Sequence, residues 1–76
     1  MDKTSQKQLG YIQIEVVRVI PQLENIISDE QKYLDDMPEA FRRSEAGEEA
    51  QEAINKAQQA IESLIEADNA LSDAQD

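Results

Sequence analysis

The residues best suited to contact another molecule lie in one short segment, Met37-Pro38-Glu39-Ala40-Phe41-Arg42-Arg43-Ser44. It holds the only Phe and the only adjacent pair of basic residues in the chain. Arginine side chains next to a helix N-terminus can receive a phosphate or a carboxylate. We therefore predict a partner-binding site formed by Phe41, Arg42 and Arg43. In the alternative reading, Phe41 packs onto the neighbouring helices and the arginines pair with nearby acidic residues.

The sequence offers no group of residues suited to catalysis. It contains no His and no Cys, which excludes the usual Zn²⁺ ligands and histidine-based acid–base chemistry. It also lacks a glycine-rich phosphate loop. Asp35, Asp36 and Glu39 lie close together, but the alternating ligands and central glycine of a calcium loop are missing. We expect a protein that is not an enzyme and has no metal and no cofactor.

The charge balance restricts the partners. Seventeen acidic residues against seven basic ones give a net charge of −10, which argues against direct binding of nucleic acid or of an anionic membrane. An acidic helix can instead imitate a nucleic-acid backbone and occupy a DNA- or RNA-binding groove. This alternative function would use the acidic face of the second half of the chain, namely Glu48, Glu49, Glu52, Glu62 and Glu66.

The first half of the chain predicts one long helix, from about residue 5 to 36. Apolar positions recur in steps of three and four, which is typical of a seam between packed helices. The predicted seam is Leu9, Ile12, Val16, Val19, Leu23, Ile26, Glu30, Tyr33 and Met37. Ser5 and Gln8 have the spacing of a capping box, and Met37-Pro38 ends the helix. Pro21 predicts a kink, and a break at that residue is the alternative.

The second half predicts a helix over about 44–74 with an internal heptad repeat. Every block of seven opens with alanine, at Ala46, Ala53, Ala60, Ala67 and Ala74. Ser44 is a suitable N-cap, and Glu45, Glu48 and Glu49 place carboxylates at the positive end of the helix. A column of small side chains lets another helix approach closely.

Together these elements predict an all-α fold with a single domain, 1–76, built as an antiparallel two-helix hairpin. Asp68 is expected to pair with Arg18 across it. A hairpin this small buries little, so we expect a homo-oligomer, most simply two hairpins in a four-helix bundle. A structural helical assembly module is therefore another candidate function. The predicted oligomer interface is a row beside the seam, namely Ile14, Val17, Ile20, Ile27 and Leu34.

The stretch Asp35-Asp36-Met37-Pro38-Glu39, followed by Ser44-Glu45, Gly47-Glu48 and a heptad helix, resembles a group of small helical proteins of phages, prophages and bacterial genomes. The resemblance covers about residues 33–67. It implies an accessory protein that binds and inhibits a bacterial host protein, such as a defence effector. No apolar run long enough for a membrane span is present, and we expect a cytoplasmic protein without membrane contact.

Overall fold

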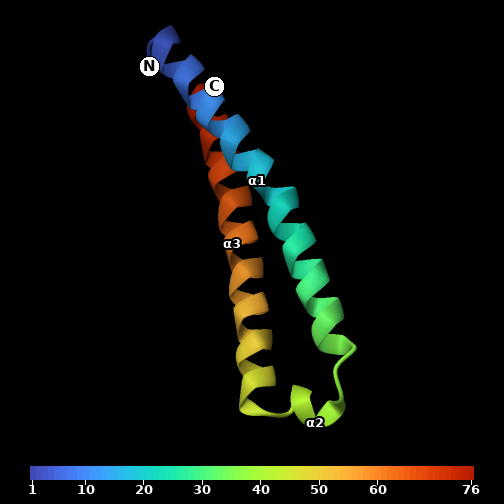
Figure 1. Ribbon diagram of the computed structural model, residues 1–76. Coiled ribbons are helices and arrows are strands. Elements are labelled where there is room, and N and C mark those ends of the chain that lie inside the picture. Colours follow the sequence, from blue (N-terminus) through green and yellow to red (C-terminus); the bar gives the residue numbers. More distant parts are fainter.

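The computed structural model describes residues 1–76, and its secondary structure consists of helices with no strands. Two long helices, α1 (Lys3–Asp35) and α3 (Glu45–Gln75), lie side by side and antiparallel, and a short helix, α2 (Glu39–Arg42), joins them (Figure 1). The two chain termini meet at one end of a rod that measures 58 × 16 × 13 Å. The predicted antiparallel hairpin is confirmed, whereas α2 lies between the two predicted helices, where the sequence predicted no further helix.

The start of α1 differs from the prediction. The helix begins at Lys3 because Asp2 is its N-cap, and the backbone N–H of Ser5 donates to the Asp2 carboxylate at 2.8 Å. Ser5 therefore lies within the first turn and does not cap the helix. The end of α1 agrees with the prediction, since the helix stops at Asp35 before Met37-Pro38.

Pro21 lies within α1, and the helix continues through it. Proline has no backbone N–H, so the Val17 carbonyl lacks its usual hydrogen-bond donor four residues later. Both Pro21 and Val17 are exposed, so water can bond that carbonyl. The alternative of a break at Pro21 is wrong.

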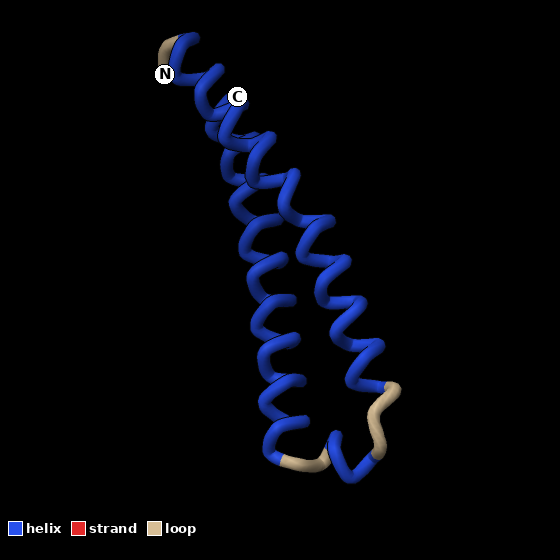
Figure 2. The backbone as a smooth tube through the Cα atoms, in the orientation of Figure 1, coloured by secondary structure: helices blue, strands red, loops and turns tan.

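The turn into α3 is held by a tight backbone contact. Ser44 is the N-cap, as predicted, and its hydroxyl accepts from the Gly47 N–H at 3.2 Å. Gly47 is buried beneath the end of α2, close to the carbonyl groups of Phe41 and Arg42. The two loops on either side of α2 are the only non-helical parts of the bend (Figure 2).

The core of the hairpin is small. Only Ile27, Leu34 and Ile54 are buried hydrophobic residues, with exposed fractions of 8%, 5% and 6%. Ala50, Ala57 and Ile61 pack against them. These positions correct the predicted seam, because its members Ile12, Ile26 and Tyr33 are all exposed.

Acidification is expected to loosen the first turn of α1. The bonds from the backbone N–H and hydroxyl of Ser5 lower the pKa of Asp2 below its ordinary 3.8. A lowered folded-state pKa means that this stabilisation is present above the unfolded pKa and is lost as pH falls through the folded value. In an NMR titration, the Ser5 amide shift should follow Asp2 with a midpoint below 3.8. An Asp2→Asn variant should lack that titration, and a midpoint at or above the ordinary value would contradict the expectation.

Candidate interaction surfaces

Two hydrogen-bonded clusters fix the register between α1 and α3. Near the bend, the side-chain amides of Gln31 and Gln51 bond reciprocally, at 3.2 and 3.1 Å. Near the termini, the Gln13 amide donates to the carboxylate of Asp68 at 2.6 Å, and the Gln75 amide donates to the Gln13 carbonyl oxygen at 2.6 Å. These contacts bring residue 31 level with residue 51, and residue 13 level with residue 68.

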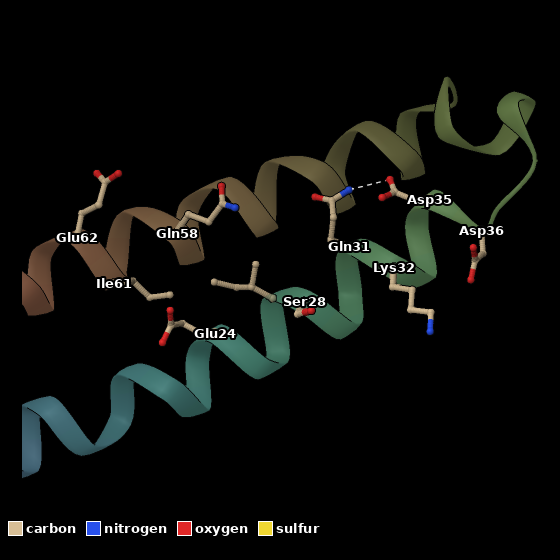
Figure 3. A pocket seen from close by; sticks show the side chains of 10 residues that line it. Glu24, Ser28, Gln31, Lys32, Asp35, Asp36, Gln58, Ile61 and Glu62 are labelled. Atoms are coloured by element: carbon tan, nitrogen blue, oxygen red, sulfur yellow. Dashed lines mark hydrogen bonds between the residues drawn. The ribbon is translucent and has the colours of Figure 1, made fainter.

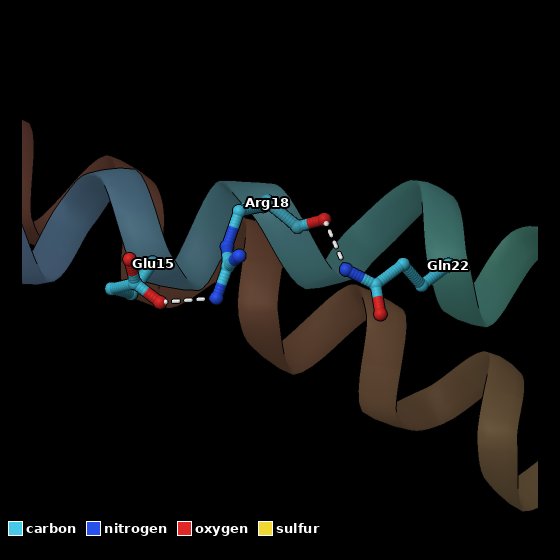
Figure 4. Close-up of polar contacts among 3 residues, drawn as sticks. All are labelled: Glu15, Arg18 and Gln22. Atoms are coloured by element: carbon cyan, nitrogen blue, oxygen red, sulfur yellow. Dashed lines mark hydrogen bonds and ion pairs between the residues drawn. The ribbon is translucent and has the colours of Figure 1, made fainter.

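The predicted pair between Asp68 and Arg18 is wrong. Asp68 faces Gln13, whereas the Arg18 guanidinium bonds the Glu15 carboxylate on its own helix at 2.7 Å (Figure 4). The Gln22 amide donates to the Arg18 carbonyl oxygen at 3.4 Å in the same close-up. Arg18 and Glu15 are largely exposed, so their ion pair adds little to stability.

One side of the hairpin carries a polar groove of about 860 Å³ (Figure 3). Glu24 and Gln31 line it from α1, and Gln58 and Glu62 line it from α3. Gln31 spans part of it and also donates to Asp35 at 2.9 Å. Transferring carboxylates and amides from water into an apolar interface costs free energy, so this side favours solvent over an apolar partner.

The other side carries an apolar groove. Its volume is about 370 Å³, and six of its seven lining residues are hydrophobic. Ile26 and Ile27 of α1 face Ala50, Ala53, Ile54 and Ala57 of α3 there, with Glu30 as the one charged residue. Ile26 has an exposed fraction of 58% and does not belong to the core cluster. Sequence reasoning missed this groove because it placed Ile26 in the hairpin seam.

We call two heptad columns beside this groove the apolar face. On α1 the column is Ile12, Val19, Ile26 and Tyr33, each seven residues from the next. On α3 it is the alanine column, Ala46, Ala53, Ala60, Ala67 and Ala74. Residues seven apart stay on nearly the same side of a helix, so the two columns run along the same side of the hairpin as Ile26 and Ala53.

The predicted oligomer interface needs correction. Ile27 and Leu34 are buried inside the hairpin, and Ile20 is half-buried, so none of them offers a free surface. Ile14 and Val17 are exposed, but Val17 precedes Glu24 and Gln31 by seven and fourteen residues and shares their polar side. The row that the sequence assigned to one interface therefore divides between the core and the polar side.

Of the three predicted contact residues at the bend, only Arg43 forms an ion pair. The Arg43 guanidinium bonds the Glu39 carboxylate at 2.6 Å, in a pair that is mostly exposed. Arg42 has no ion-pair partner, and Phe41 is 38% exposed, so these two remain accessible. A role for Phe41, Arg42 and Arg43 in binding stays a prediction.

The carboxylates of the predicted acidic face lie on exposed positions of α3. Of these, only Glu52 forms an ion pair, with Lys56 at 3.4 Å. Their role as a nucleic-acid mimic stays a prediction. No helix combines the length and the apolar character needed to cross a membrane. Comparisons with family models, with curated proteins and with solved structures give no match to this chain.

Proposed function

We propose that this chain is a non-enzymatic interaction module, a hairpin that binds helices through its apolar face and pairs first with a second copy of itself. The main support for this proposal is the apolar groove around Ile26, which no side chain of the hairpin fills. Two hairpins joined through this face make a four-helix bundle, in which the hydrophobic residues of both grooves become core. The structural assembly role expected from the sequence is thus the part of the function that the geometry supports best.

The exposed area of the chain supports this proposal. A compact monomer of this mass exposes about 4,700 Å², whereas the elongated hairpin exposes 5793 Å². The difference, about 1,100 Å², exceeds the area of about 800 Å² that each partner buries in a standard interface. Pairing through the apolar face would bring the chain to the exposure of an ordinary folded protein.

A charge introduced on the apolar face should separate the copies. Light scattering and sedimentation should give twice the chain mass of 8.6 kDa for the wild type. Ile26→Glu would bury an unpaired carboxylate, which costs about 3–5 kcal/mol and weakens the dimer by about 100-fold or more. Circular dichroism on the same samples reports whether the helices persist.

The matched control is Ile14→Glu, which adds the same charge to the same helix. Ile14 has an exposed fraction of 62%, against 58% for Ile26, but it precedes Ser28 and Asp35 of the polar groove by 14 and 21 residues and so lies on that side of α1. The control should therefore keep the mass of the wild type. Equal dissociation of the two variants, or a helical monomer for the wild type, would contradict self-association and leave the face to a different protein.

The further expectation, that a bacterial host protein binds at the bend, rests on the sequence resemblance and on the accessibility of Phe41 and Arg42. It is compatible with the dimer, because the bend lies at one end of the rod, outside the apolar groove. The nucleic-acid mimic is likewise compatible with it, since all five carboxylates of the acidic face are exposed and none of them lines the apolar groove.

A further inference from the structure

We infer that the two copies pair with their bends at the same end, so that α1 of each copy packs on α3 of the other. This inference rests on the proposed dimer and specifies its arrangement. Two face-to-face arrangements have twofold symmetry. In one, the symmetry axis runs along the rod and the bends coincide. In the other, the axis crosses the rod, the bends lie at opposite ends, and each helix meets its own copy.

The choice depends on the shapes of the two columns. The α1 column carries large side chains, Ile12, Val19, Ile26 and Tyr33, and the α3 column carries only alanines. With the bends together, each large column faces an alanine column. With the bends apart, large side chains meet large ones and alanines meet alanines, so one helix pair is held apart while the other leaves voids. Close packing favours a large column against a small one.

The register of the hairpin makes this fit specific. Since residue 31 is level with residue 51 and residue 13 with residue 68, Ile26 lies level with about residue 55. A twofold axis along the rod keeps each level unchanged. Ile26 of one copy therefore falls between Ala53 and Ala60 of the second copy.

The same reasoning places the other three large side chains. Val19 falls between Ala60 and Ala67, Ile12 between Ala67 and Ala74, and Tyr33 between Ala46 and Ala53 of the second copy. All four side chains thus meet gaps between alanines, which is the knobs-into-holes arrangement of a coiled coil. Both columns repeat every seven residues, so the fit of one large side chain between two alanines recurs at every heptad along the rod.

This arrangement gives the dimer two different ends. The Phe41, Arg42 and Arg43 side chains of both copies gather at one end, and all four termini gather at the other. A partner that binds the bend would then meet residues from both copies at once. The arrangement with bends apart would instead give each end one bend.

The position of the bends can be measured directly. The chain has no cysteine, so Ala40→Cys provides a single labelling site on α2, at an exposed position outside the apolar face. Spin labels on this variant should lie at well under half of the 58 Å rod length from each other. Oxidation should also link two Ala40→Cys chains readily, because both cysteines lie at the same end.

The reciprocal control uses Thr4→Cys, an exposed position at the other end of the rod. Mixed dimers of Ala40→Cys and Thr4→Cys should give label distances close to the rod length of 58 Å. A dimer with the reverse result, long between identical sites and short in the mixture, would overturn the inference and leave the proposed dimer intact. A monomeric mass for both variants and for the wild type would overturn the proposed dimer itself.

Discussion

Leu34→Ala is expected to destabilise the hairpin severely. Leu34 is 5% exposed and belongs to a core with only two other buried hydrophobic side chains, Ile27 and Ile54. Truncating a buried leucine costs about 2–5 kcal/mol, and a chain of this length has a total stability of about 4–11 kcal/mol. The variant should therefore lose a large share of its free energy of unfolding, measured by urea denaturation followed by circular dichroism.

The matched control for Leu34→Ala is Ile14→Ala. Ile14 lies on the same helix, but its exposed fraction is 62%, so truncation removes few contacts. Its urea midpoint should stay close to that of the wild type. All samples need the same chain concentration, because the stability of a self-associating protein depends on it. Equal losses for the two variants would contradict a core formed by Ile27, Leu34 and Ile54.

The sequence predicted the two long helices and part of their packing. Helix existence followed from the three-four spacing, and the ends of both helices at the bend followed from Pro38 and Ser44. The column of Leu9, Val16, Leu23 and Met37 was correctly assigned to the inner side, since none of these residues is exposed. Glu30, which belongs to the same column, is exposed. In the accompanying column Ile12, Ile26 and Tyr33 are exposed, and only Val19 is half-buried.

The reason is that α1 has apolar columns on both sides of this shared column. Ile26 and Ile27 are neighbours in sequence, and either could complete a seam with Leu23. One residue corresponds to a rotation of about 100° around the helix. In the structure Ile27 is the buried one of the two. With Ile27 facing α3, Gln13 bonds to Asp68 and Gln31 bonds to Gln51 across the two helices. Single-sequence reasoning could not predict that pairing.

The error is informative about function. A helix with one partner needs one seam, but the spacing around Ile26 is that of a second seam. Its presence on an exposed side of the hairpin is the physical basis for proposing a further helix pair there. The remaining features, such as the identity of any partner at the bend, depend on a second molecule and cannot follow from the sequence of this one.

Gly47→Ala is expected to weaken the bend. In most helices this change stabilises, because alanine has a better helix propensity by about 1 kcal/mol. Here a Cβ on residue 47 would overlap the Phe41 carbonyl oxygen and lie 2.6 Å from the Arg42 carbonyl oxygen. Both obstacles are backbone atoms, so the end of α2 would have to move away from α3. We expect a loss of about 1–3 kcal/mol, the usual cost of overpacking.

The chain contains its own control, because its only other glycine lies within α1. A Cβ on Gly10 would meet the Oε1 atom of Gln75 at 3.2 Å, the far end of a flexible side chain that needs to move by only a few tenths of an ångström. Gly10→Ala should therefore show the ordinary gain in helix propensity, about 0.5–1 kcal/mol. Thermal denaturation of both variants should give shifts of opposite sign, a lower midpoint for Gly47→Ala and a higher one for Gly10→Ala. A midpoint raised by both substitutions would mean that α2 does not pack on Gly47, and the bend would then be an open loop whose Phe41 and Arg42 have no fixed position.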